Sequence, residues 1–246
     1  MEVAHLEDIT NHLNTVLAAA TKNARPPDCM IRFYNGMGHI PWKIGTAVAL
    51  LTAIDTIKVF AGAISNRTDA AIQVIYQYRV RPWRLLWGLG DHLWQTSYNC
   101  RSVRSRGIFT RQAVSFLLGE SQGGNQAKVT LVSLGSGSAS QMLHGIVDNH
   151  HNSSDIHLIL VDNDSEALER GRKNARSLGI EDIIDSRETT VGRFLEQVEP
   201  DSVGLIEMVG LTDYFDDGKF HRYLHGIYSA LRRGGYFLGS NISSRE

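Results

Sequence analysis

The chain has 246 residues and a formal net charge of −1, with 42% hydrophobic and 21% charged residues. These fractions are ordinary for a globular protein and argue against global disorder, and the length allows one large domain or two smaller ones. The near-neutral charge excludes a general attraction to nucleic acid or to an anionic membrane. The two cysteines, Cys29 and Cys100, are too few for a disulfide framework and too far apart for zinc-ligand spacing.

The N-terminal segment MEVAHLEDIT contains three acidic residues and no apolar run, so it does not have the pattern of a signal peptide. The most apolar stretch, residues 44–54, is shorter than the roughly 20 apolar residues that a membrane-spanning helix needs. We therefore expect neither a secretion signal nor a membrane span, and a cytoplasmic location.

Helical patterns dominate the first 120 residues, as the apolar stripe of Leu6, Ile9 and Leu13 illustrates. The predicted helices are residues 3–20, 44–64, 70–78, 83–94 and 107–118. A polar, glycine-rich run at 121–126 then marks a predicted boundary. We expect a helical N-terminal domain, 1–120, that caps the site and supplies the substrate side, and a second domain, 128–246.

After the boundary, short β-branched and apolar runs alternate with helical patterns. The predicted strands are residues 129–134, 156–161, 183–184, 203–209 and 236–239, and the predicted helices are 140–147, 165–178, 191–198 and 220–231. This alternation predicts an α/β fold, a Rossmann-like and mostly parallel sheet flanked by helices.

The first predicted strand runs into Gly135-Ser136-Gly137. Two glycines allow a tight turn and a close approach of a ligand to the backbone, and the next helix points its free N–H groups at the same space. Asp162 and Asn163 end the second strand at the same edge of a parallel sheet. Because a carboxylate there can accept hydrogen bonds from both hydroxyls of a ribose, the two features predict a site for an adenosine nucleoside.

The dinucleotide pattern G-x-G-x-x-G requires a third glycine where this chain has Ser140, and a P-loop pattern is missing from the sequence. The order of strand, Gly-x-Gly turn and acid resembles the class I S-adenosylmethionine-dependent methyltransferases. The resemblance covers about residues 128–240 and includes the stretches 165–175, 205–215 and 231–238. The arginine-containing segment ahead of this domain is also similar to a bacterial group of these enzymes that has a helical N-terminal region.

This resemblance implies S-adenosylmethionine as the cofactor. The turn would contact its methionine part, the acid after the second strand its ribose, and the end of the third strand its adenine. The implied cofactor-binding residues are Gly135, Ser136, Gly137, Asp162, Asn163, Glu188, Glu207 and Met208, together with Arg104 and Arg106. The alternatives are an ordinary strand–helix turn for the glycines, and a solvated loop for Glu188, where Asp185 is a competing candidate.

Two features depart from the family pattern. Position 133, two residues before the first glycine, is often acidic in the family and is Ser133 here, so the amino group of the cofactor needs another partner. The sequence also ends at Glu246, soon after the fifth predicted strand, whereas the family fold adds two more strands. We expect either a fragment or a sheet truncated after its fifth strand, with the edge covered by a partner chain, as in a homo-oligomer, or by an N-terminal segment.

An acid within the apolar run 205–209 is expensive to bury without a partner, which favours Glu207 as a site residue. A cofactor contact, substrate orientation and a general base remain open as its role. Asp213 and Tyr214 follow on a loop that could reach a substrate, so these three are the candidate catalytic residues. No metal site is expected, because His221 and His225 lack a third ligand.

Residues 79–111 contain seven arginines and one acid, with Trp83, Trp87 and Trp94 among them. This composition suits an RNA-contacting patch, an anionic ligand, or solvated arginines beside core tryptophans. We favour a helical cap with Arg104 and Arg106 near the cofactor, and we do not favour RNA as a partner.

The function expected from these patterns is transfer of a methyl group from S-adenosylmethionine to an unidentified small molecule. Such a reaction depends on alignment and on exclusion of water more than on one reactive side chain. An NAD(P)-dependent oxidoreductase and a non-catalytic interaction protein with a cofactor fold are the alternatives.

Overall fold

The computed structural model describes residues 2–24, 68–78, 91, 94–95, 98–121, 128–149 and 155–240. The chain divides into two compact units, Met1–Gly107 and Ile108–Glu246. The division falls inside helix α7 (Tyr98–Ser121). The predicted boundary stays a prediction, because residues 122–127 lie outside the described residues.

The first unit contains α1 (Glu2–Ala24), α5 (Thr68–Tyr76) and the start of α7. Helix α7 begins at Tyr98, well before the predicted start at residue 107. Cys100 and Val103 are buried and extend the apolar stripe of the helix toward its start. The arginines between them interrupt the apolar pattern, so the sequence did not predict this part of the helix. The predicted helix 44–64 lies outside the described residues, and only residues 91 and 94 of helix 83–94 lie inside them.

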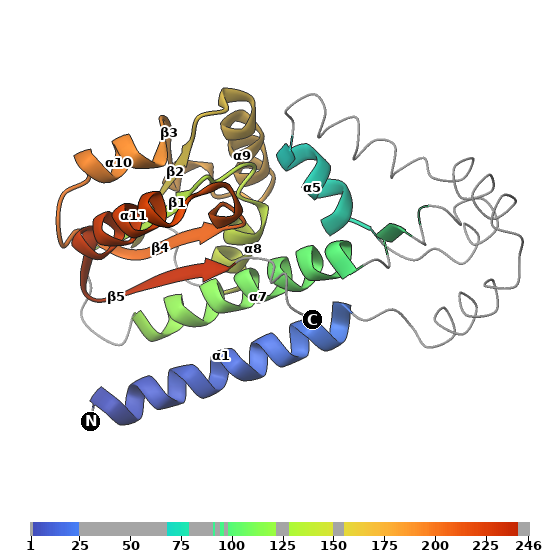
Figure 1. Ribbon diagram of the computed structural model, residues 1–246, viewed down its shortest axis with the longest axis horizontal. Helices are drawn as coiled ribbons and strands as arrows, with labels where there is room; N and C mark the ends of the chain where they lie inside the picture. The colour runs from blue at the N-terminus through green and yellow to red at the C-terminus, as the bar shows by residue number, and fades with distance from the viewer. Residues whose placement is uncertain are drawn as a thin grey trace, which may run out of the picture. The chain divides into compact units, whose positions relative to one another are not determined.

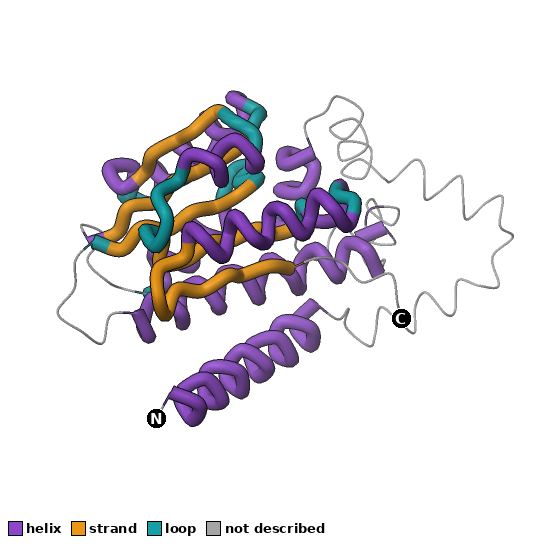
Figure 2. Tube along the Cα trace, turned by 60° about the vertical axis from the view of Figure 1, so that its left-hand side comes forward, coloured by secondary structure: helices purple, strands orange, loops and turns teal. Residues whose placement is uncertain are grey.

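The second unit is built on a five-stranded sheet in the order β3-β2-β1-β4-β5 with all neighbours parallel, shown in Figures 1 and 2. The strands are β1 (Val129–Leu134), β2 (Ile156–Asp162), β3 (Ile184–Glu188), β4 (Val203–Val209) and β5 (Leu231–Ser240). The predicted α/β, Rossmann-like fold is therefore confirmed. Within the described residues, β5 forms one edge of the sheet.

Helices connect the strands in sequence. They are α8 (Ser140–Asp148), α9 (Ser165–Ser177), α10 (Val191–Gln197) and α11 (Asp217–Ala230), with short 3-10 turns η3 (Glu181–Ile183) and η4 (Thr212–Tyr214). Because parallel crossovers are right-handed, the connections toward β3 place α8 and α9 on one face, and those toward β5 place α10 and α11 on the other (Figure 1).

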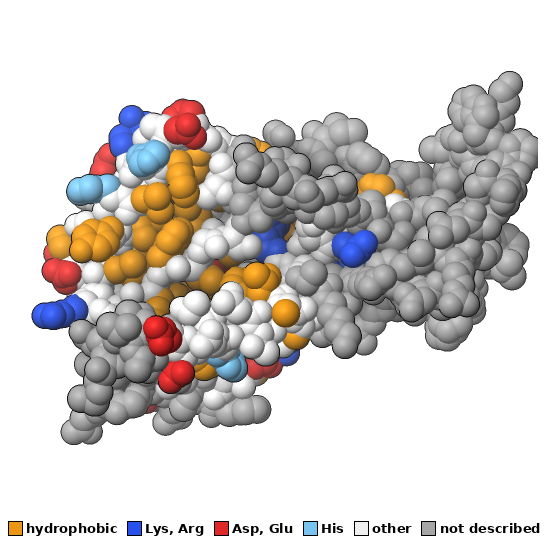
Figure 3. Space-filling view, turned by 60° about the horizontal axis from the view of Figure 1, so that its bottom comes forward, with side chains coloured by type: hydrophobic (Ala, Val, Ile, Leu, Met, Phe, Trp, Pro, Cys, Tyr) orange, Lys and Arg blue, Asp and Glu red, His pale blue; other side chains and the backbone are white. Residues whose placement is uncertain are grey.

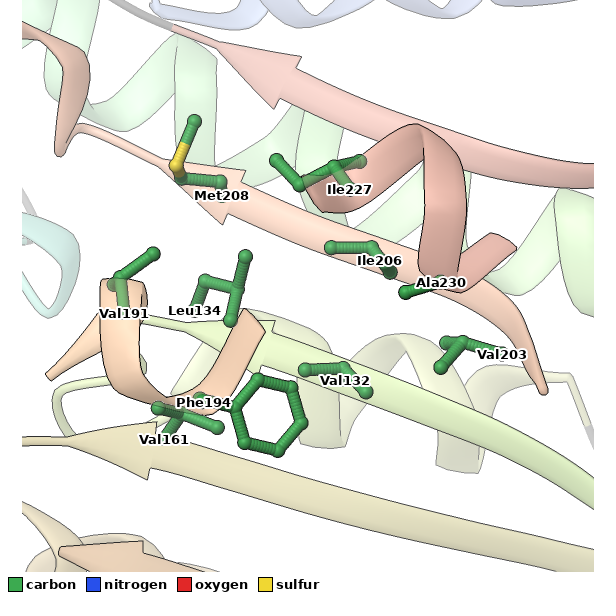
Figure 4. Packing of buried hydrophobic residues seen from close by; sticks show 10 residues of the cluster. All are labelled: Val132, Leu134, Val161, Val191, Phe194, Val203, Ile206, Met208, Ile227 and Ala230. Carbon is green, nitrogen blue, oxygen red and sulfur yellow. The ribbon is translucent and has the colours of Figure 1, made fainter. Parts of the chain in front are cut away.

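One core cluster of the described residues lies between the sheet and the helices α10 and α11 (Figure 4). Strand residues such as Leu134 and Ile206 are fully buried there against Phe194 of α10 and Ile227 of α11. On the other face, a Cβ added to Gly171 of α9 would lie 3.0 Å from Leu160, so a glycine at this position lets α9 approach β2 closely.

Two strands differ in extent from their predictions. Strand β3 runs to Glu188, so this residue ends the strand instead of following it. Strand β5 starts at Leu231, and the predicted turn lies within it as an irregularity between the pairs Val203–Leu231 and Leu205–Tyr236. Gly234 provides the positive φ of 76° that this irregularity requires.

Candidate functional site

The carboxyl ends of β1 and β4 lie side by side in the middle of the sheet. The chain leaves β1 toward one face and β4 toward the other, which makes this the topological switch point where ligands bind in open α/β sheets. The strand register places Ser133 beside Glu207 and Asp162 beside Glu188. The predicted site residues of β1, β2, β3 and β4 therefore lie along the same side of the sheet, where the carboxyl ends of the strands are.

The turn between β1 and α8 has an unusual backbone. Gly135, Gly137 and Ala139 have φ values of 64°, 52° and 50°, and the last of these is a strained conformation for a residue with a Cβ. The N–H of Ser136 donates to the carbonyl of Val161 at 3.0 Å. The tertiary structure thus holds the turn in a conformation that only the two glycines adopt without cost.

Asp162 links this turn to its neighbours. Its Oδ2 accepts from the N–H of Gly137 at 2.8 Å, and its Oδ1 accepts from the N–H of Asp164 at 3.0 Å. The backbone carbonyl of Asp162 accepts from the N–H of Thr189 at 2.9 Å. Because each carboxylate oxygen has two lone pairs, both oxygens keep the capacity to accept one more donor, as a ribose diol would require.

Asp164 has a different role from Asp162. It is the N-cap of α9, and its side chain accepts from the N–H groups of Glu166 and Ala167. This separates a structural acid from the candidate ligand-binding acid two residues before it. Asn163, between them, is exposed, as is Glu188 at the end of β3.

Glu207 is buried on β4, with 8% of its surface exposed. The hydroxyl of Ser133, itself 1% exposed, donates a hydrogen bond to Oε2 of Glu207 at 2.5 Å. The acid inside an apolar strand thus has a hydrogen-bond partner next to the glycine turn. Met208 follows it, is fully buried in the α10–α11 core cluster (Figure 4), and its contact with a cofactor stays a prediction.

Two further residues shape the turn and were missed in the sequence. Asn174 of α9 donates from Nδ2 to the carbonyl of Ser138 at 3.0 Å. A Cβ added to Gly135 would lie 2.8 Å from Leu211, so the chain after β4 closes over the turn. Asn174 could have been recognised in the sequence as a polar residue between Gly171 and Ala175, which are buried. Leu211 could not, because its position near the turn depends on the pairing of β1 with β4.

The remaining candidate catalytic residues lie in η4, after Gly210 with its φ of 75°. Tyr214 is 69% exposed. The structure describes the backbone of Asp213 but not the surroundings of its side chain. Their participation in catalysis stays a prediction.

Arg104 and Arg106 belong to the first unit. The guanidinium of Arg104 donates to the side-chain carbonyl of Gln95 at 2.8 Å and to its backbone carbonyl at 2.5 Å, and lies 5.9 Å from the ring centroid of Tyr78. Burial lowers the pKa of Arg104 from its ordinary value. Arg106 is 9% exposed. A cofactor contact of either arginine stays a prediction.

Among the described residues, groups of three or more His, Cys, Asp or Glu side chains that could hold a metal ion are not found. In the same part of the chain, no helix is long and apolar enough to cross a membrane. His221 lies on the exposed side of α11, where its Nδ1 is 2.7 Å from the carbonyl oxygen of Asp217.

Comparison with known proteins gives matches in solved structures only. No protein-family model matches the chain, and neither does any curated protein. The matching structures include geranyl diphosphate C-methyltransferase from Streptomyces coelicolor A3(2), 21% identical over 51% of this chain and 43% of that chain, with a TM-score of 0.40. They also include a methyltransferase from Geobacter sulfurreducens in complex with S-adenosyl-L-homocysteine, 21% identical over 51% of this chain and 46% of that one, with a TM-score of 0.39.

A third match covers more of the chain. It is a protein from Bordetella parapertussis described as a possible exported protein, 14% identical over 94% of this chain and 70% of that chain, with a TM-score of 0.54. The chain spans about half the length of the methyltransferases that it matches, 43% and 46%. At these identities the likeness shows the fold alone.

Proposed function

We propose that this protein is an S-adenosylmethionine-dependent methyltransferase that acts on a small-molecule acceptor. The observation that carries the proposal is the hydrogen bond from the N–H of Gly137 to Asp162 at 2.8 Å. It joins the glycine turn and the acid at the switch point of the sheet, where the fold places ligands. The two features that the sequence assigned to one nucleoside site are therefore one connected structure.

The glycine pattern of the turn favours this cofactor over a dinucleotide. Asp162 lies at one side of the turn and Glu207 at the other, on the strands that flank β1. An acid at the end of the second strand also binds the ribose of NAD, so Asp162 suits the nucleoside of either cofactor. Ser140 stands where the dinucleotide pattern requires a third glycine, which disfavours NAD(P) as the cofactor.

Each group at the turn has its own role in the proposed site. Asp162 holds the ribose, the backbone of residues 135–137 faces the methionine part, and Glu207 lies on the β4 side of the turn. When bound, the cofactor supplies a methyl group on a positively charged sulfur that needs no further activation. Leu211, packed over Gly135, excludes water from this side of the turn, which such a displacement requires.

The acceptor is proposed to be a small molecule that enters over η4, where exposed Tyr214 lies. The face shown in Figure 3 carries a patch of hydrophobic side chains bordered by charged and histidine side chains. A second copy paired along β5 and a cytoplasmic location complete the proposal.

Calorimetry with S-adenosylhomocysteine tests this function, and fluorescence titration with NADH tests its main rival. We expect saturable binding of S-adenosylhomocysteine at one site and none of NADH. A folded protein that does not bind S-adenosylhomocysteine would refute the proposal, and binding of NADH instead would establish the oxidoreductase. Binding without methylation of any acceptor in extracts supplied with labelled donor would favour the non-catalytic alternative.

A further inference from the structure

We propose that the first unit binds the phosphate group of a small phosphate monoester at Arg101 and Arg104, and that Gln95 positions Arg104 for this contact. The three residues lie within Met1–Gly107. The glycine turn and the strand ends that carry the proposed cofactor site belong to the second unit. Phosphate binding by the first unit and cofactor binding by the second can therefore be tested apart.

Gln95 holds the guanidinium of Arg104 in place. Arg104 donates from Nη1 to the side-chain oxygen Oε1 of Gln95 at 2.8 Å, and from Nη2 to the Gln95 backbone carbonyl at 2.5 Å. The guanidinium also lies 5.9 Å from the ring centroid of Tyr78. Because these contacts orient the guanidinium before a ligand arrives, they lower the cost of ordering it on binding, which makes Gln95 a positioning residue.

Two buried N–H groups of these residues have no acceptor in the described structure. They are Nε2 of Gln95 and Nε of Arg101, and Gln95 is 0% exposed. Arginine donates hydrogen bonds and accepts none, so its contact with Arg104 turns the Gln95 oxygen toward the guanidinium and leaves Nε2 unpaired. Buried donors cost free energy when they are unpaired, and such groups can mark the place of an ion. A ligand that only accepts hydrogen bonds suits this set of donors.

Positive charge gathers at the start of α7. Arg101 and Arg104 are three residues apart on this helix, a spacing that places two side chains on one face. Burial lowers the pKa of Arg104, the Cys100 thiol raises it when ionised, and the charge of Arg101 lowers it. The first turn of α7 contains no acidic residue, and the positive end of the helix dipole lies there. Since neighbouring guanidinium groups repel each other, an anion bound at both would stabilise them.

A phosphate monoester matches these groups better than a carboxylate or a nucleic acid does. It carries about two negative charges at neutral pH, one for each guanidinium, and its oxygens accept bidentate hydrogen bonds from arginine. A carboxylate supplies only one charge. A nucleic acid is bound by basic side chains exposed along a surface, whereas Gln95 is buried and both arginines are partly buried.

Thermal melting of the full-length chain tests the proposal, with inorganic phosphate as the probe and chloride at equal ionic strength as the reference. We expect phosphate to raise the melting temperature until the site is saturated, as binding to the folded state requires. Phenyl phosphate, a monoester, should give a similar response. Acetate should bind at least about tenfold more weakly, because it forms fewer charge-assisted hydrogen bonds.

Arg101→Gln and Arg104→Gln should each weaken phosphate binding at least about tenfold, as for the loss of hydrogen bonds to a charged group. Arg172→Gln is the matched control, because Arg172 is exposed on α9 and pairs with Glu169 at 3.2 Å. This control should change phosphate affinity by less than about twofold.

Gln95→Glu gives a result that a purely structural role of Gln95 does not predict. Its carboxylate replaces the amide to which Arg104 donates at 2.8 Å, so the chain itself supplies negative charge to the arginines. We expect this variant to keep or raise the melting temperature without phosphate, and to lose the response to phosphate. A phosphate response equal to that of the wild type would overturn the proposal.

Circular dichroism establishes that each variant is folded, and the two arginine variants provide the test if Gln95→Glu is not. Phosphate stabilises many proteins by exclusion from their surface, and a rise that does not saturate and is equal in wild type and arginine variants would overturn the proposal. An equal loss in Arg172→Gln would do the same. An RNA oligonucleotide that binds more tightly than phenyl phosphate, and is lost in the arginine variants, would replace the small monoester by RNA and also overturn it.

Discussion

The two faces of the sheet differ in what they bury near the same strand ends. On the α10–α11 face, Leu134, Ile206 and Met208 are fully buried in an apolar cluster (Figure 4). On the opposite face, the same strands bury Ser133 and Glu207, joined by a hydrogen bond. Apolar packing needs no polar partner, whereas buried polar groups cost free energy unless they are paired.

This difference separates stability from ligand binding. We interpret the α10–α11 face as a source of stability and the polar end of the other face as the site. Substitutions on the first face should therefore change the free energy of unfolding and spare the affinity for S-adenosylhomocysteine, whereas substitutions of ligand-binding side chains at the site should change that affinity.

The largest effect is expected for Phe194→Ala on α10. Phe194 is 8% exposed within the apolar cluster, and removing a buried phenylalanine costs about 3–5 kcal/mol of unfolding free energy. Chemical denaturation measures this loss. The affinity for S-adenosylhomocysteine should stay within about twofold under conditions where the variant is folded, and a large loss of affinity would break the separation of the two faces.

Gly135→Ala is expected to have the next largest effect, a loss of unfolding free energy. The left-handed φ of 64° costs a residue with a Cβ about 1–2 kcal/mol, and the contact of 2.8 Å with Leu211 adds about 1–3 kcal/mol of overpacking. The free energy of unfolding measures the sum.

Gly179→Ala is the matched control for this prediction. Gly179 has a similar φ of 72°, but nothing lies within 4 Å of an added Cβ, so only the conformational cost remains. The double variant Gly135→Ala with Leu211→Ala should recover part of the unfolding free energy that Gly135→Ala loses beyond Gly179→Ala. If the two glycine substitutions cost the same unfolding free energy, Leu211 moves aside without cost and the overpacking is absent.

Asp162→Ala should weaken binding of S-adenosylhomocysteine by about 1.5–3 kcal/mol, the range for hydrogen bonds to a charged group. It should also loosen the turn, because the N–H of Gly137 loses its acceptor. Calorimetry measures the affinity, and an unchanged value would place the ribose elsewhere.

The smallest effect is expected for Asp164→Ala, two residues further on. Its carboxylate caps α9, and loss of an N-cap costs about 1 kcal/mol of stability. Affinity for the ligand should not change. Thermal melting and calorimetry on Asp162→Ala and Asp164→Ala compare two aspartates of one loop. If Asp164→Ala weakened ligand binding and Asp162→Ala lowered only the stability, their roles would be exchanged.

Most of the sheet could be predicted from local patterns. The β-branched runs at 129–134 and 203–209 coincide with β1 and β4, since buried parallel strands are continuously apolar. Strand β3 was underestimated because Asp185 and Arg187 interrupt its pattern, and the structure pairs their side chains at 2.8 Å. Strand β5 was shortened because Gly234 and Gly235 indicate a turn, whereas pairing with β4 keeps them in the strand.

The site could be predicted in part. Glycines before a helix and an acid after a strand have a local signature, and the structure connects Gly137 to Asp162. Leu211 has no such signature, because its contact with Gly135 exists only once β4 lies beside β1.

Local sequence patterns indicate which segments form strands and helices of the second unit, which residues begin the turn after β1, and that an acid lies inside the apolar run of β4. Which strands are neighbours, and hence that Ser133 lies beside Glu207 across β1 and β4, follows only from the folded arrangement. This is because the period of apolar residues acts over a few residues, whereas strand order and register depend on contacts between segments far apart in the chain.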